Sequence, residues 1–155
     1  MNAHADPSPI RDGFNSNTLP ANDDGSTGLV PLGFSINFFG VGFTEGYVNN
    51  NGNMTFDQPL GTFTPFGLAS TNTKIIAPFF ADVDTRQLGS NPVTYGQGTV
   101  GSRPAFAVNW LNVACFATPN GGYNTLQMVL IDRSDIGTGD FDIEFNYGSI
   151  LWETG

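Results

Sequence analysis

The sequence is poor in cysteine, histidine and positive charge. Its 155 residues contain one cysteine, Cys115, and one histidine, His4, so no internal disulfide can form and a Cys–His catalytic pair is not expected. Lysine and arginine together number 5 against 14 aspartates and glutamates, which gives a formal charge of −9. Binding to nucleic acid and to anionic membrane surfaces is disfavoured, because both are bound through clustered cations.

Long apolar runs are missing as well. No stretch approaches the roughly 18 apolar residues of a membrane-spanning helix, so we expect no membrane span. Residues 1–4 lack the basic and apolar regions of a secretion signal. Only 12% of the residues are charged, about half the usual share, and a scarcity of lysine and glutamate is typical of secreted proteins.

What the chain does contain is glycine, proline and phenylalanine. Its 20 Gly, 10 Pro and 14 Phe favour tight turns and strands over helices and over disorder. The apolar residues show no helical period of any length. The sequence therefore predicts an all-β fold, either an antiparallel sandwich or another compact β-fold with long loops.

The chain divides into a polar segment and a strand-rich one. Residues 1–28 are rich in Pro, Gly, Asn and Asp without a clear period, and we interpret them as an extended N-terminal arm with Ile10 and Phe14 as anchors. Residues 29–155 are interpreted as one β domain. Alternation and apolar runs predict its strands at 29–38, 41–48, 54–56, 75–80, 93–95, 105–113, 126–132 and 141–147.

Turn and core positions can be predicted within this domain. Asn51-Gly52 is a strong signal for a hairpin with a type I′ turn, in which both residues have positive φ. Cys115 has apolar neighbours and is expected to be a small buried residue. The aromatic residues expected in the core are Phe38, Phe39, Phe79, Phe80 and Trp110.

Several segments follow one another in a characteristic order. They are FSINFFG at 34–40, YVNNNGN at 47–53 with TF at 55–56, IAPFFADVDT at 76–85, RPAFAVNW at 103–110, LQMVLID at 126–132, DFDIEFNY at 140–147 and WETG at 152–155. Together they resemble the nidogen-like extracellular domain, the NIDO domain, over roughly residues 30–155. Domains of this family continue past the last of these segments, so residues 29–155 are expected to be a C-terminally short version.

The resemblance implies a function as well as a fold. It implies an extracellular, secreted or cell-surface location, no enzymatic activity, no catalytic residue, and a role in cell–matrix adhesion with extracellular or matrix proteins as partners. An alternative is a self-assembling extracellular fibre subunit that adds a strand to another copy of itself. Strand 141–147 has an apolar inner face and lies near the end of the chain, and the 1–28 arm is the expected cover for an edge there.

Two carboxylates suggest a metal. Asp82 and Asp84 follow an apolar run and share one face by alternation, so they suit Ca²⁺, the one cofactor considered. The alternative is that these acids cap turns and pair with Arg86 or Arg133. A third interpretation is a hydrolase with paired catalytic carboxylates. The acids that would add further metal ligands are Asp132 and Asp135, or Asp140 and Asp142.

One position carries a modification signal. Asn53-Met54-Thr55 is an N-x-S/T acceptor, so Asn53 is a glycosylation site if the protein is secreted through a eukaryotic pathway. The neighbouring Asn49, Asn50 and Asn51 are expected to serve the turn, because asparagine tolerates left-handed backbone and caps turns through its side chain.

Overall fold

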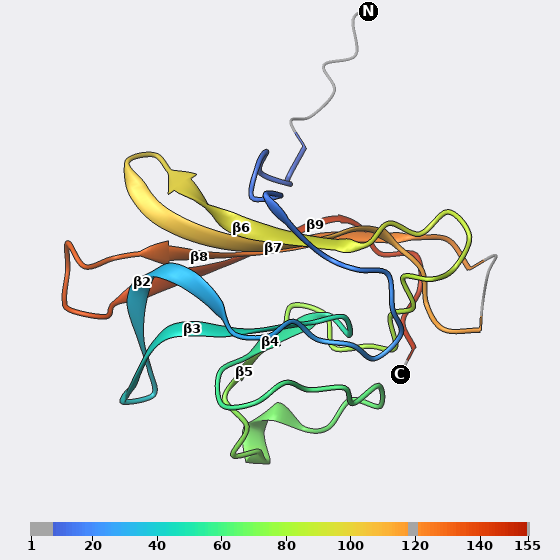
Figure 1. Ribbon diagram of the computed structural model, residues 1–155, viewed down its shortest axis with the longest axis horizontal. Coiled ribbons are helices and arrows are strands. Elements are labelled where there is room, and N and C mark those ends of the chain that lie inside the picture. The colour runs from blue at the N-terminus through green and yellow to red at the C-terminus, as the bar shows by residue number, and fades with distance from the viewer. Residues whose placement is uncertain (1–7, 118–120, 155) are drawn as a thin grey trace, which may run out of the picture.

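The structure is a computed structural model that describes residues 8–117 and 121–154. These residues form two antiparallel sheets, with the strand orders β1-β6-β7-β8-β9 and β2-β3-β4-β5, which confirms the predicted all-β class (Figure 1). The elements are β1 (Asn17–Leu19), β2 (Val30–Phe38), β3 (Val41–Asn49), β4 (Asn53–Thr55), the 3-10 turn η1 (Leu68–Ser70), β5 (Ile75–Ile76), β6 (Val93–Val100), β7 (Arg103–Val113), β8 (Asn124–Asp132) and β9 (Phe141–Ser149).

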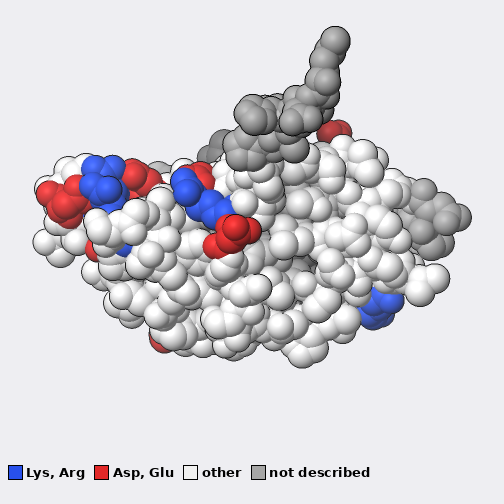
Figure 2. Space-filling model, turned by 90° about the horizontal axis from the view of Figure 1, so that it is seen from above, with Lys and Arg blue, Asp and Glu red and all other residues white. Residues whose placement is uncertain are grey.

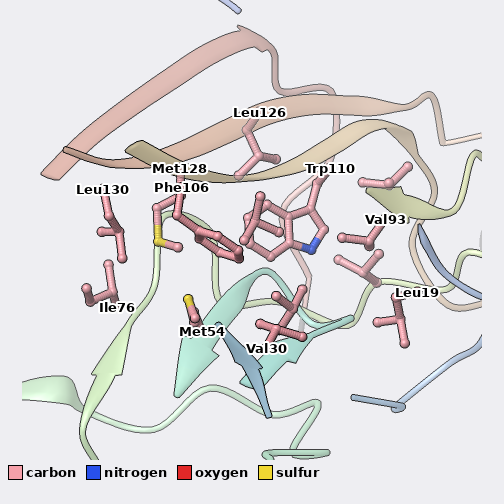
Figure 3. Close-up of a cluster of buried hydrophobic side chains, with 14 of the residues drawn as sticks. Leu19, Val30, Met54, Ile76, Val93, Phe106, Trp110, Leu126, Met128 and Leu130 are labelled. Carbon is pink, nitrogen blue, oxygen red and sulfur yellow. The ribbon is translucent and has the colours of Figure 1, made fainter. Parts of the chain in front are cut away.

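The two sheets form a sandwich with the main core between them. Alternate residues of β7 and β8, including Trp110 and Met128, point inward and meet Met54 and Ile76 of the second sheet (Figure 3). Trp110 is fully buried, and its indole N–H donates to the Asn50 carbonyl oxygen at 3.0 Å. The main core thus also fixes the hairpin tip of β3 and β4.

The outer face of the five-stranded sheet holds a second, smaller core. Phe14 packs there against Ala105, Ala107, Val129 and Ile131, all of which point away from the main core. This explains why β8 is apolar at both odd and even positions, since each face of the strand is covered. Phe14 reaches its place with a positive φ of 56°.

Residues 11–16 cross this outer face from β9 to β6, with contacts to each strand between them. The Gln127 side chain accepts from the Arg11 backbone N–H at 3.0 Å and donates to the Arg11 carbonyl at 2.9 Å, and Asn109 donates to the Phe14 carbonyl. A Cβ at Gly98 would collide with the Phe14 ring. Glycine within β6 therefore allows the close approach of this segment.

The N-terminal arm next forms a short strand at the edge of the five-stranded sheet that is farthest from β9. Residues Asn17–Leu19 form β1, which pairs antiparallel with β6 at Tyr95, Thr94 and Val93. The expectation that the arm covers the edge next to strand 141–147 is therefore wrong for the described residues: the arm's strand closes the far edge, and β9 stands last in the order. Arg11 does reach β9, but through its side chain, which pairs with Glu144 at 2.6 Å.

Two strands differ from their predicted lengths by more than two residues. β6 has eight residues where three were predicted, because its glycines hide the alternation. The apolar run 75–80 pairs as a strand only at Ile75–Ile76. Pro78 lacks an N–H, and the following amides of Phe79 and Ala81 donate to the carbonyls of the 50–52 loop instead.

The turn chemistry also differs. Phe39 and Gly40 both have positive φ, so the type I′ geometry lies between β2 and β3, and Phe39 is 89% exposed rather than in the core. The β3–β4 hairpin is present as predicted, but its loop has three residues, 50–52, of which Gly52 alone is left-handed. A Cβ on Gly52 would overlap the Phe79 carbonyl oxygen.

Candidate functional site

The β3–β4 hairpin tip is a buried knot of asparagine side chains. Asn49, Asn50, Asn51 and Asn53 are all fully buried. Asn49 donates to Asn53 at 2.7 Å and accepts from the backbone N–H of Leu60 at 3.0 Å. Such a buried polar network is stable only when its members are satisfied, so these residues fix the surrounding loops in place.

The knot brings together two acidic segments that are distant in sequence. Asn50 donates to the carbonyls of Asp23 and Val83, both at 2.5 Å. Asn51 donates to the Asp24 carboxylate at 2.9 Å and accepts from the Val83 N–H at 3.0 Å. The 22–25 turn and the 81–85 segment therefore lie against the same hairpin tip.

This arrangement creates a carboxylate cluster. One oxygen each from Asp23, Asp24 and Asp82 lies within 4.8 Å of the others. The three acids line a cavity of about 110 Å³ together with Phe63 and Phe116. Oδ1 of Asp23 is buried and has no hydrogen-bond partner among the described residues. A set of hard oxygen ligands at this spacing is suited to a cation.

The electrostatics of the cluster are unfavourable without a cation. Burial raises the pKa of Asp82, and the neighbouring charges of Asp23 and Asp24 raise it further. Burial likewise raises the pKa of Asp23 and the Asp84 charge adds to the effect, which exceeds the opposing effect of Arg86, paired with Asp23 at 2.7 Å. Both shifts mean that the charged carboxylates are less stable here than in water. A bound cation would relieve this cost.

Asp84 lies beside the cluster but is already engaged. Its Oδ1 accepts from the Arg86 backbone N–H at 3.0 Å and from Arg86 Nε at 2.8 Å, and its Oδ2 accepts from Arg86 and Gln87. Burial raises the pKa of Asp84, but the bonds from Arg86 and Gln87 outweigh it and lower the pKa overall. This is the turn-capping and Arg86-pairing role that the sequence offered as the alternative to metal binding. Ca²⁺ binding at Asp82 and Asp84 stays a prediction.

The other candidate acids serve a different turn. Arg133 pairs with Asp135 at 3.1 Å and with Asp142 at 2.8 Å, and Asp132 accepts from Ser134. They lie at the β8–β9 turn and do not join Asp82. Asp23 and Asp24 were not considered from the sequence. The Asp23-Asp24-Gly25 run indicates a turn, and nothing in its spacing connects it to Asp82.

Asn53 is a poor acceptor for a glycan in the folded chain. The side chain is fully buried, donates to the Asn51 carbonyl at 3.0 Å and accepts from Asn49. A glycan requires an exposed amide nitrogen and room for its bulk. The burial of Asn53 argues against glycosylation there in the folded domain.

A second candidate site is the surface of β9. Its odd residues up to Tyr147 share the inner face of the sheet, because Ile143, Phe145 and Tyr147 stand opposite Leu130, Met128 and Leu126. The predicted alternation is correct, yet these three side chains are 44%, 41% and 44% exposed. β2 packs over β6, β7 and β8, so the second sheet shields those strands and leaves the apolar side of β9 at the surface.

The outer side of β9 is charged but largely neutralised. Glu144 pairs with Arg11, and Asp142 pairs with Arg133. Seen from the side of the five-stranded sheet, charged side chains are few and gather toward one end, with basic and acidic groups side by side (Figure 2). β9 therefore has one apolar face, one polar face and a backbone edge.

Comparison with known proteins places the chain in a family. Residues 8–153 match the family described as NIDO related. The chain is 33% identical over 162 residues to alpha-tectorin of Mus musculus and of Homo sapiens, and 29% identical over 157 residues to nidogen-2 of Mus musculus. These alignments cover 91%, 91% and 82% of the chain.

The chain spans 7% of the length of each of these alpha-tectorins and 11% of nidogen-2. No solved structure gives a significant match. Within residues 8–117 and 121–154, no helix is long and apolar enough to cross a membrane. Alpha-tectorin and nidogen-2 are extracellular matrix proteins, and NIDO domains are extracellular. The match over almost its whole length shows that this chain belongs to the NIDO-related family of extracellular domains.

Proposed function

We propose that this chain is a non-enzymatic module that binds matrix proteins and thereby takes part in cell–matrix adhesion. Family membership supports the extracellular setting. The observation that carries the proposal is the surface of β9, where three large apolar side chains on a sheet edge are more than two-fifths exposed. Clustered apolar side chains exposed on a soluble protein are typical of interaction sites.

The geometry of β9 favours one mode of binding. An extended segment of a partner can add to the sheet edge through its backbone, while its alternate side chains extend the apolar inner face. Catalysis would require a different kind of site, with a nucleophile or an acid–base pair held against a substrate. The proposal therefore assigns the binding to β9 and assigns no chemistry to the chain.

A panel of purified matrix proteins tests this function. We expect saturable binding of the wild-type chain to at least one of them, and at least about tenfold weaker binding of the Phe145→Asp variant. Leu88→Asp is the matched control, because Leu88 is 90% exposed and lies outside β9. Equal binding by the wild-type and Phe145→Asp chains, or binding to none of the panel, would contradict the proposal.

Self-assembly is the second candidate function, and the same strand favours it. β9 alternates apolar and polar residues along its length, so it has the pattern that an added strand needs. An extracellular fibre subunit would use strand addition between copies to build a polymer. Electron microscopy of concentrated protein separates the two candidates, since polymers support the second and discrete particles support the first.

Calcium binding is proposed as an accessory property. The carboxylates of Asp23, Asp24 and Asp82 and the unpartnered Asp23 oxygen support a site in this cluster, with Asp82 the residue shared with the sequence prediction. The ion would stabilise the junction of three loops at the hairpin tip and would take no part in chemistry. A melting temperature that rises on addition of Ca²⁺ would support this site.

A further inference from the structure

The outer face of the five-stranded sheet carries three rows of side chains that run across β6, β7, β8 and β9. In two rows the residues grow from glycine on β6 through alanine on β7 to valine or isoleucine on β8, and each of these rows ends on an acid of β9. The third row is polar throughout. The rows are Gly98, Ala105, Ile131 and Asp142; Gly96, Ala107, Val129 and Glu144; and Thr94, Asn109, Gln127 and Asn146. The small residues of β6 and β7 therefore leave a trough beside the polar row.

The trough is filled by one side chain of the N-terminal arm. Residues 8–16, called the latch from here on, lie over the three rows, and the Phe14 ring packs against the alanines of the trough. A Cβ on Gly98 would come within 2.7 Å of this ring. Phe14 is the one buried residue between Ser8 and Thr18. The latch is thus held by a single apolar anchor.

The polar row binds the backbone of the latch. Gln127 accepts from the Arg11 N–H at 3.0 Å and donates to the Arg11 carbonyl at 2.9 Å, and Asn109 donates to the Phe14 carbonyl at 3.0 Å. Both amide side chains are buried, and they would make these bonds to an extended segment of any sequence. The Arg11 side chain adds two hydrogen bonds to Glu144, at 2.6 and 2.7 Å. Backbone bonds combined with a few side-chain anchors are typical of peptide-recognition sites.

The latch is an imperfect occupant of this site. Phe14 has a φ of 56°, a left-handed conformation that is strained for a bulky residue. Together with Gly13, at 84°, it turns the chain so that Asn17–Leu19 can pair with β6. A segment that does not continue into β1 needs no such turn. Hollows of about 370 and 590 Å³ also border the latch, toward Thr94 and toward Val100, so the face has room for a larger occupant.

We propose that this outer face is a second binding site, closed in the free chain by its own latch. Its ligand is a basic segment of another protein that carries an aromatic residue three positions after an arginine, as the latch itself does. This segment displaces the latch and places its aromatic ring in the trough. The site lies on the side of the sheet opposite to the exposed apolar side of β9, so the inference goes beyond the proposed function.

Charge and mass action favour another protein over a second copy as the source of this segment. The latch of a second copy has the same residues and must make the same turn into β1. It therefore gains nothing over the resident latch, which its own chain holds at a high effective concentration. Two chains with a formal charge of −9 also repel each other, whereas they attract a basic segment. An arginine of that segment takes over the pairing with Glu144 when Arg11 leaves.

A basic peptide tests the site on the full chain. The probe is Lys-Lys-Arg-Ala-Ser-Phe-Ala-Lys-Lys, and its control has alanine in place of phenylalanine. We expect saturable binding of the probe and at least about tenfold weaker binding of the control, because the trough binds the aromatic ring. Bound probe should also speed hydrogen exchange of the latch amides, because the Arg11 N–H loses its bond to Gln127.

Variants that loosen the latch give the sharpest result. An occupied site lowers the apparent affinity for a competitor, so Phe14→Ala should bind the probe at least about tenfold more tightly than the wild type. Arg11→Gln releases Glu144 and should bind it about threefold more tightly, which keeps the test valid if Phe14→Ala does not fold. Phe39→Ala is the matched control and should bind like the wild type, because Phe39 is 89% exposed and lies between β2 and β3.

Four results would overturn the proposal. Absence of binding would remove the site, and equal binding of the probe and its control peptide would remove the role of the trough. Unchanged affinity in Arg11→Gln and in folded Phe14→Ala, with unchanged hydrogen exchange of the latch, would mean that the probe only adheres to acidic surface. Tighter binding by a peptide with the sequence of residues 8–16 would favour exchange of latches between copies. None of these results bears on β9, which Phe145→Asp tests separately.

Discussion

The two edges of the five-stranded sheet are treated in opposite ways. At one edge the chain supplies its own cover: residues 11–16 cross the outer face, Phe14 is buried, and β1 pairs with β6. At the other edge β9 is longer than β1 by six residues, and its inner-face side chains stay at the surface. The same sheet therefore has a closed edge and an open one.

The apolar residues at the closed edge contribute mainly to folding, whereas those on β9 remain available for binding. Apolar residues on the closed side contribute to folding of the single chain, because they are removed from water when the chain folds. Apolar residues on β9 contribute less to folding and retain surface that a partner can bury. A substitution on the closed side should therefore change the free energy of unfolding, and one on the open side should change association.

We expect the largest loss of stability from a substitution on the closed side. Phe14→Ala should lower the free energy of unfolding by about 3 kcal/mol, because it empties the second core. Phe145→Ala should lower it by less than about 1 kcal/mol, since that side chain is already 41% exposed. Urea denaturation of dilute protein measures both values. Equal losses would mean that the two sides do not differ as described.

The next largest loss of stability is expected where the sheet binds residues 11–16 through polar side chains. Gln127 is fully buried and bonds to Arg11, Asn109 and Asn146. Gln127→Ala should cost about 2 kcal/mol, because it leaves buried partners unsatisfied. Gln97→Ala is the control: Gln97 is exposed, and its loss should cost no more than about 0.5 kcal/mol. Similar midpoints for the two variants in urea would argue against the anchoring role of Gln127.

The cluster of Asp23, Asp24 and Asp82 lies on neither edge of the sheet, and its expected effect is a calcium-dependent gain in stability. With a dissociation constant near 1 mM, 10 mM Ca²⁺ should stabilise the fold by about 1.4 kcal/mol and raise the melting temperature. The effect should grow from pH 4 to pH 7, because the ligands must be deprotonated and the pKa values of Asp23 and Asp82 are raised.

Asp82→Asn combined with Asp24→Asn should abolish the calcium effect. Asp57→Asn is its control, because Asp57 pairs with Lys74 outside the cluster. A melting temperature that does not respond to Ca²⁺ in the wild-type chain would leave the three acids as turn residues.

The smallest expected effect is the pH dependence of the contact between the closed and open sides. The hydrogen bond from Arg11 lowers the pKa of Glu144 below its ordinary value of 4.5. A lowered folded-state pKa gives stability that is present above about pH 4.5 and is lost as the pH falls further. The pair is partly exposed, so Arg11→Gln should cost at most about 1 kcal/mol at pH 7 and less at pH 3. Urea midpoints at the two pH values measure this, and a constant difference would show that the pair does not act through charge.

Some of the architecture could be predicted from the sequence, because it is encoded by local alternation. The alternation of β2 and β9 and the two-sided apolar character of β8 correctly gave strands and their faces. β1 could not be predicted: Asn-Thr-Leu has no period, and it becomes a strand only because β6 lies beside it. Whether the apolar face of a strand is buried could not be predicted from the strand's own sequence either, because it depends on how far the opposite sheet extends.

The candidate site was less accessible to sequence reasoning. Asp82 was identified, but its neighbours Asp23 and Asp24 lie about 60 residues earlier, and long-range contacts such as those of the buried Asn50 and Asn51 side chains bring them together. Those asparagines were interpreted as turn residues because their pattern has no spacing that indicates a network. The exposure of Phe145 was not predicted either, since apolar alternation normally indicates a buried face.

Equilibrium binding to purified matrix proteins tests most directly the central claim, that the exposed apolar side of β9 is an interaction surface. The wild-type chain and the Leu88→Asp variant should bind at least one of these proteins equally well, and Phe145→Asp should bind it at least about tenfold more weakly. A wild-type chain that binds none of them, or a Phe145→Asp variant that binds as well as the wild type, would contradict the account.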